Sequence, residues 1–187
     1  MAWLVVGLGN PGSSYSGNRH NVGAMVAHEL ARRDSAKWKT RRGTKAETAE
    51  VRIGTQPVTL ATTKVYMNQS GVSVRNLLAD LRLKPDHLIV VHDELDLDLG
   101  RIRTKYGGGD NGHNGLKSIR SLVGRDYYRV RIGIGRPSGP VDVVDWVLRD
   151  FDRTERQELA DILPRAADAV TCLITEGLEA TQSKYNG

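Results

Sequence analysis

Residues Val5–Gly12 read VVGLGNPG, an apolar run that passes directly into a turn. Three glycines in it match G-x-G-x-x-G, which holds dinucleotides only when a helix begins at the glycines: Gly7, Gly9 and Gly12. Here NPG is a turn sequence, and the next helical pattern begins near Val22. The stretch therefore predicts a buried strand that ends at Gly7 and a loop that projects Asn10 at the carboxyl end of that strand, where open α/β sheets bind ligands.

Strand and helix patterns alternate through the rest of the chain. We expect helices at 22–33, 70–83 and 116–124, and strands at 46–54, 56–64, 86–94, 100–106 and 127–135. TERQ, Thr154–Gln157, is a capping-box pattern that opens a long C-terminal helical region. KWKTRRGTK, from Lys37 to Lys45, is expected to be a basic loop. This order predicts one three-layer α/β domain over residues 1–187, with a mixed twisted β-sheet flanked by helices.

The composition is typical of a globular protein outside membranes. The 187 residues are 39% hydrophobic and 26% charged, and no apolar stretch is long enough to cross a bilayer. We expect no signal peptide, because the first apolar run is short and has no basic segment before it. A single cysteine, Cys172, favours a reducing, cytoplasmic setting. The net charge of +5 is consistent with simple solubility or with a polyanionic partner.

Four segments place histidine, asparagine or acidic residues at a strand end or in a loop: GNPGSSYSGNRHN (9–21), KVYMNQSG (64–71), VVHDELD (90–96) and GGGDNGHNG (107–115). Each follows or approaches an apolar strand, so we expect them to meet at one edge of the sheet. Histidine titrates near neutrality and suits a general base, and an aspartate fixes its tautomer. The candidates are His20, His92 and His113 with Asp93.

The residue types favour direct activation of water. There is no G-x-S-x-G, and Cys172 lies in the helical C-terminal region, so no nucleophile is evident. Asparagine side chains both donate and accept, which suits an amide or a carbonyl. His92 also fits a structural group, and His113 and Asn114 each fit a helix cap. No H-E-x-x-H spacing occurs, and we expect no metal.

Four long motifs resemble those of the bacterial peptidyl-tRNA hydrolases: GLGNPGSSYSGNRHNVG, TKVYMNQSG, VVHDELDLDLGRIRTKYGGGDNGHNGLKSI and YYRVRIGIGRP. The resemblance covers nearly the whole chain in register. It is weaker near Lys37 to Lys45 and in the C-terminal region. It implies a monomeric, cofactor-independent esterase that acts on peptidyl-tRNA and so recycles tRNA from stalled or aborted translation.

The same resemblance implies a role for each matching residue. His20 is similar to the catalytic base and Asp93 to its orienting partner. Three asparagines resemble the substrate-positioning amides: Asn10, Asn68 and Asn114. Met67 looks like a wall of the peptide site, His113 like a rim residue, and Tyr15 like the aromatic side chain beside the tRNA 3′ end. Lys105 and Arg131 resemble the clamp on the tRNA 5′ phosphate.

Two other functions stay open on the residues alone. An NAD-type oxidoreductase would need a helix that begins at Gly9. A non-hydrolytic RNA-binding relative, of the kind that serves RNA splicing, would keep the fold without the chemistry. The presence of both His20 and Asp93 argues against the second alternative.

Overall fold

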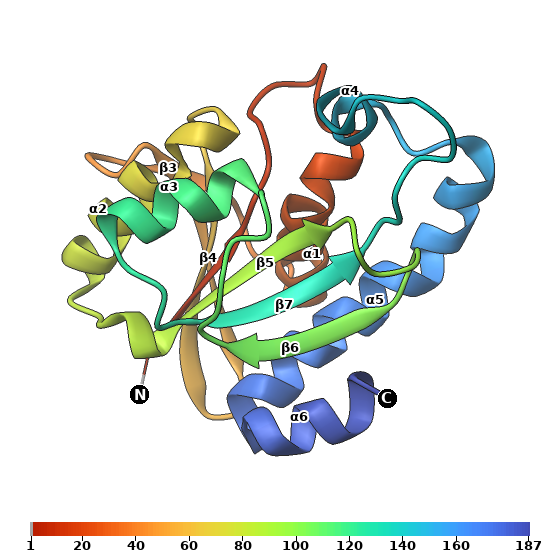
Figure 1. Ribbon diagram of the computed structural model, residues 1–187. Helices are drawn as coiled ribbons and strands as arrows, with labels where there is room; N and C mark the ends of the chain where they lie inside the picture. The colour runs from red at the N-terminus through yellow and green to blue at the C-terminus, as the bar shows by residue number, and fades with distance from the viewer. Residues whose placement is uncertain (1) are drawn as a thin grey trace.

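The computed structural model describes residues 2–187 and contains a seven-stranded sheet (Figure 1). Its strands are β1 (Trp3–Gly7), β2 (Lys39–Arg41), β3 (Ala46–Ile53), β4 (Gln56–Thr63), β5 (Leu88–Glu94), β6 (Ile102–Tyr106) and β7 (Tyr128–Gly133). They lie in the order β2-β3-β4-β1-β5-β7-β6. Strands β4, β1, β5 and β7 run parallel, whereas β2, β3 and β6 are antiparallel to their neighbours. The expected mixed sheet is confirmed.

Helices cover both faces of this sheet (Figure 1). They are α1 (Val22–Arg33), α2 (Ser70–Leu81), α3 (Asn114–Leu122), α4 (Val143–Leu148), α5 (Arg153–Glu176) and α6 (Leu178–Tyr185), with 3-10 turns η1 (Arg19–Asn21), η2 (Met67–Gln69) and η3 (Pro85–His87). One apolar core lies under α1 and α5, and a second lies under α2 and α3. The three-layer arrangement is therefore as expected.

Strand β1 belongs to both cores. Val5 packs into the core under α1 and α5, while Leu4 and Val6 pack into the core under α2 and α3. Side chains alternate between the two faces of a strand, and all three of these are fully buried. A continuous apolar run is the pattern required of a parallel strand that helices cover on both sides.

The glycines after β1 serve packing and turning. The first α-helix after β1 begins at Val22, so no α-helix begins at the glycine motif and the dinucleotide alternative fails its structural test. A Cβ on Gly7 would overlap the carbonyl of Gly23, and a Cβ on Gly23 would overlap the carbonyl of Val91. Only Gly12 of the three motif glycines has a left-handed φ, of 100°. The pair Gly7 and Gly23 lets α1 lie directly against β1 and β5.

Three local expectations were wrong or incomplete. Part of the basic loop, Lys39–Arg41, pairs with β3 as the edge strand β2. Helix α4 had no counterpart in the expected elements. The capping box joins Asp152 and Glu155 in place of Thr154 and Gln157, because the Asp152 carboxylate accepts from the Glu155 N–H and Glu155 accepts in return. Aspartate caps a helix at least as well as threonine, so Asp152 is the N-cap and the helix begins at Arg153.

Substituting Gly23→Ala tests this close approach. The added methyl meets the backbone carbonyl of Val91, which has no free side-chain end to move aside. We expect the free energy of unfolding to fall by about 3 kcal/mol or more, as for other overpacked cores. Denaturant titration measures it. Gly109→Ala is the control, because a Cβ there meets nothing within 4 Å; equal losses in both variants would contradict the packing role of Gly23.

Candidate active site

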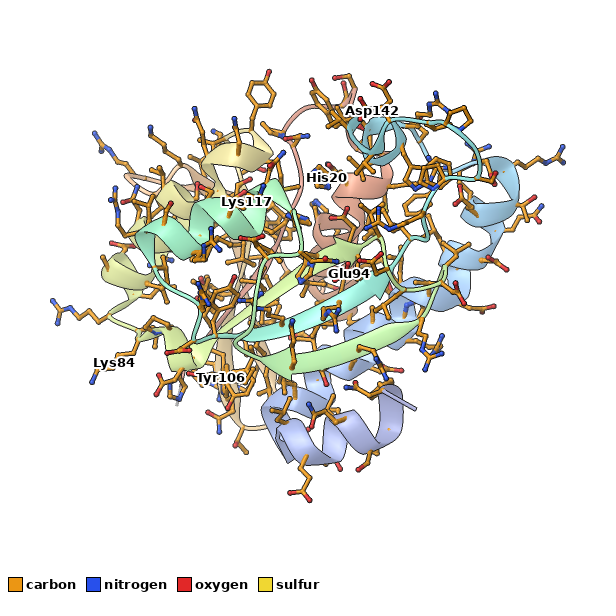
Figure 2. The ribbon with its side chains drawn as sticks, in the orientation of Figure 1. His20, Lys84, Glu94, Tyr106, Lys117 and Asp142 are labelled. Carbon is orange, nitrogen blue, oxygen red and sulfur yellow. The ribbon has the colours of Figure 1, made fainter. Side chains whose placement is uncertain are left out.

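The carboxyl ends of β1, β4 and β5 lead into one cavity of about 280 Å³. His20, in η1 just before α1, and Glu94, at the end of β5, both line this cavity, and both are labelled in Figure 2. Eight of the ten expected site residues line the cavity: Asn10, Tyr15, His20, Met67, Asn68, Asp93, His113 and Asn114. Lys105 and Arg131 are not among its lining residues. The four motif segments therefore meet as expected.

His20 and Asp93 form a buried pair. His20 Nδ1 lies 2.8 Å from Asp93 Oδ2, and the two residues are 8% and 3% exposed. A carboxylate only accepts, so Nδ1 donates the proton and Nε2 is left as the basic atom. Burial by itself lowers the pKa of His20, but the negative charge and hydrogen bond of Asp93 outweigh it and raise the pKa above its ordinary value.

Asp93 is held on its other oxygen by His113. His113 Nε2 lies 2.8 Å from Asp93 Oδ1, while its Nδ1 accepts from the N–H groups of Gly115 and Leu116 as the N-cap of α3. This capping fixes the tautomer, so Nε2 carries the proton and donates it to Asp93. Burial would raise the pKa of Asp93, yet the two imidazoles hold it well below its usual range.

His113 therefore differs from the expected rim residue. Its side chain is 8% exposed, and it caps α3, whereas Asn114 is the first residue of the helix and not its cap. The neighbouring His92 behaves as a structural group. Its Nδ1 donates to the Asp93 carbonyl, and burial together with His113 lowers its pKa to about 3, so it stays neutral.

The three asparagine side chains differ in the hydrogen bonds that they already make. Asn10 Oδ1 accepts from the Met67 N–H at 2.7 Å, which leaves only Asn10 Nδ2 to donate into the cavity. Asn68 in η2 and Asn114 in α3 are exposed, and neither side chain has a hydrogen-bond partner within residues 2–187. One lone pair of Asn10 Oδ1 is thus already used, whereas the side chains of Asn68 and Asn114 have all of their donors and acceptors available.

The chain segment that carries His20 is anchored by contacts of Arg19 with α4 and α5. Arg19 is 3% exposed, pairs with Glu155 at 2.7 Å and stacks on Trp146 with its guanidinium carbon 3.5 Å from the ring centre. Glu155 also takes part in the capping box that begins α5. Helix α5, remote in sequence, therefore helps to set the position of His20.

Aromatic and aliphatic side chains surround the mouth of the cavity. Tyr15 lies edge-on to Tyr66, with ring centres 6.1 Å apart, and Tyr66 is 59% exposed. Helix α4 adds Val143, Val144 and Leu148, all exposed. The sequence signal for this wall was Asp142 before the run VVDWVL, since Asp142 caps the helix by accepting from the Val144 N–H.

Lys105 and Arg131 lie on one face of β6 and β7. Lys105 pairs in register with Arg129, two residues from Arg131, so their side chains point to the same side of the sheet. Arg131 is already bonded to the carboxylate of Glu94 at 3.0 Å. Burial and the nearby charges of Arg131 and Arg129 lower the pKa of Lys105. An anion bound here must share Arg131 with Glu94.

The donor atoms of His20, Asp93 and His113 lie within 4.8 Å of one another, a spacing that fits a metal ion. In the observed arrangement both imidazole atoms that face Asp93 carry protons. A cation there would have to displace both protons and break both hydrogen bonds. The set therefore fits a base and its supports better than a metal centre. Among residues 2–187, no helix is both long and apolar enough to span a membrane.

Comparison with known proteins gives consistent matches. A family model described as peptidyl-tRNA hydrolase matches residues 4–187. The peptidyl-tRNA hydrolase of Frankia alni is 53% identical, covering 98% of this chain and 93% of the relative, and that of Streptomyces coelicolor is 53% identical over 98% and 94%. The crystal structure of peptidyl-tRNA hydrolase from Acinetobacter baumannii matches with a TM-score of 0.89, 33% identity and coverage of 98% and 95%.

Asp93→Asn tests the electrostatics of the pair. The substitution removes the charge that raises the pKa of His20 and leaves the burial that lowers it, so we expect the His20 pKa to fall below 6.5. Histidine NMR titration measures it. In the wild type, protonated His20 stabilises the fold below about pH 6.5, and this contribution is lost as pH rises through the raised pKa. A His20 pKa unchanged in the variant would contradict the coupling.

Proposed function

Because this chain belongs to the peptidyl-tRNA hydrolase family, we propose that it hydrolyses the ester bond between the peptide and the 3′ ribose of tRNA, with His20 as the general base and Asp93 as its orienting partner. The reaction would return tRNA from peptidyl-tRNA released by stalled or aborted translation. The observation that carries the mechanism is the 2.8 Å bond from His20 Nδ1 to Asp93, which leaves Nε2 free in the cavity.

Water is the nucleophile in this proposal. No serine, threonine or cysteine is among the described residues that line the cavity. His20 Nε2 takes a proton from water as the water oxygen bonds to the ester carbonyl carbon. When the bond to the ribose 3′ oxygen breaks, the same nitrogen returns the proton to that oxygen. We assign Asn10 Nδ2 as the donor to the carbonyl oxygen, where negative charge develops.

The remaining cavity residues are proposed to bind the substrate on either side of the ester. Asn68 and Asn114 have free carboxamides that can pair with the peptide amide. Met67, which is 4% exposed, forms a wall for the peptide. Tyr15, with Tyr66 beside it, offers an aromatic surface to the 3′ end of the tRNA. His113 acts through Asp93 and does not need to touch the substrate.

Lys105 and Arg131 are proposed to bind the 5′ phosphate of the tRNA. Both are cations on the same sheet face, and phosphate contacts supply salt-dependent affinity. Glu94 holds the Arg131 side chain in place before the phosphate binds. The Glu94 carboxylate also competes with the phosphate for the Arg131 guanidinium.

Other features of the protein follow from the family resemblance. We propose that residues 1–187 act as one domain, as a monomer without a cofactor, in the cytoplasm. A non-hydrolytic RNA-binding role is not favoured, because His20 and Asp93 are both present and bonded to each other.

Release of N-acetyl-amino acid from N-acetyl-aminoacyl-tRNA, with EDTA present, tests the function. We expect the wild type to hydrolyse the ester and His20→Ala to lower kcat by about 10²–10⁴-fold with the fold intact, because the base is lost. The control is His28→Ala, which removes a histidine outside the cavity. Near wild-type turnover in His20→Ala would remove His20 from the mechanism.

Substrates with and without the 5′ phosphate test the clamp. We expect Lys105→Ala and Arg131→Ala to raise KM for full-length substrates and to flatten the salt dependence, because a phosphate contact is lost. A short mimic without the phosphate should be affected little.

Lys84→Ala is the matched control for loss of a positive charge, since Figure 2 shows Lys84 far from His20. It should leave both substrates unchanged. Equal losses on the two substrates in the Lys105 and Arg131 variants would indicate that these residues support the structure instead.

A further inference from the structure

The turn that carries Asn10 separates two cavities. Asn10 lines the active-site cavity of about 280 Å³ and also a second cavity of about 320 Å³ that includes Pro11, Gly12 and Asn21. A Cβ built on Gly12 meets nothing within 4 Å, so the tip of the turn has open space beside it. A loop with so little packing needs another constraint if it is to present Asn10 in one orientation.

Asn21 supplies that constraint through two hydrogen bonds to the backbone of Asn10. Asn21 Oδ1 accepts from the Asn10 N–H at 2.9 Å, and Asn21 Nδ2 donates to the Asn10 carbonyl at 2.9 Å. The side-chain amide thus satisfies both backbone groups, as a neighbouring strand would. Asn21 is 5% exposed, and Gly9 lies so close that a Cβ there would be 2.8 Å from Asn21 Cγ.

A third bond completes the restraint. The Met67 N–H donates to Asn10 Oδ1 at 2.7 Å. Of the polar atoms of Asn10, the backbone N–H, the backbone carbonyl and Oδ1 are all engaged. Nδ2 is the one that these bonds leave for the substrate.

We propose that Asn21 is a positioning residue that holds Asn10 so that its Nδ2 donor is oriented toward the reacting carbonyl before the substrate binds. The inference rests on the proposed function and names a residue that the site roles above do not use. Asn21 directly follows His20 in η1, so its bonds also join the donor to the segment that carries the base. A donor that is already oriented need not reorganise as charge develops.

A double-mutant cycle on ester hydrolysis tests the role of Asn21. We expect Asn10→Ala to lower kcat by about 10²–10³-fold, as the loss of one donor to the developing charge does. Asn21→Ala should lower kcat by about 10–100-fold with little change in KM, because the other substrate contacts remain. In the double variant, kcat should equal that of Asn10→Ala, since Asn21 has then nothing left to position.

Two controls separate positioning from general damage. Asn18→Ala removes another buried asparagine of the same segment, which bonds Asp150 at 2.6 Å, and its effect should multiply with that of Asn10→Ala. The pH midpoint of kcat/KM should be unchanged in Asn21→Ala, because the His20–Asp93 bond is untouched. A shifted midpoint, or an Asn21 effect that multiplies with that of Asn10→Ala, would overturn the inference.

If Asn21→Ala does not fold, Asn21→Asp repeats the cycle. It keeps the shape and the acceptor for the Asn10 N–H and loses the donor to the Asn10 carbonyl. The activity of the wild type separates a failure of the proposed function from a failure of the role proposed for Asn21. Absence of hydrolysis in the wild type would refute the proposed function, whereas hydrolysis with an additive cycle would refute only the role of Asn21.

Discussion

The buried carboxylate of Asp93 is the constraint on which the site depends. A charge that is 3% exposed must be paired, and both of its oxygens accept from imidazole N–H groups, of His20 and of His113. These partners come from η1 and from the N-terminus of α3, on opposite faces of the sheet. One charge at the end of β5 therefore joins three segments and also sets the pKa of the base.

Close backbone packing makes this pairing possible. Gly7 and Gly23 allow α1 to lie against β1 and β5, which brings η1 over the end of β5. Arg19, bonded to Glu155 and stacked on Trp146, holds the same short segment from the other side. The position of His20 thus depends on the close packing of α1 against β1 and β5 and on the buried ion pair between Arg19 and Glu155.

Six of the seven strands and the main helices were predictable because each follows from a local pattern, whereas Met67 and Asn68 were assigned to the site by the family resemblance. A continuous apolar run that ends in charged residues predicted β5, and the turn sequence NPG excluded a helix at the first glycines. The predictions that failed concern features that depend on residues distant in the sequence. Lys39–Arg41 becomes a strand only because β3 offers an edge. The capping box is different, because Asp152 and Glu155 also have the local spacing of a capping box, and only the bond of Glu155 to Arg19 depends on a distant residue. The rim position of His113 was implied by the family resemblance. The local sequence predicts its helix cap, which is confirmed, but no local pattern predicts the bond from its Nε2 to Asp93.

Asn10, Asn68 and Asn114 differ in the hydrogen bonds that they already make, and under the proposed function this difference suggests different roles for them. Reading a peptide amide requires an acceptor for its N–H as well as a donor for its carbonyl. Asn10 Oδ1 already accepts one hydrogen bond from the Met67 N–H, so the donor Nδ2 is the polar side-chain atom of Asn10 that these bonds leave unused, and it suits a carbonyl or the developing oxyanion. The carboxamide oxygens of Asn68 and Asn114 accept no hydrogen bond from any residue that the structure describes, so we assign the acceptor to one of them. An aminoacyl-tRNA carries a free amine in place of the amide and would leave such contacts unmade, at about 1–3 kcal/mol each. In the proposed reaction, discrimination against aminoacyl-tRNA is therefore assigned to Asn68 and Asn114, and stabilisation of the developing charge to Asn10.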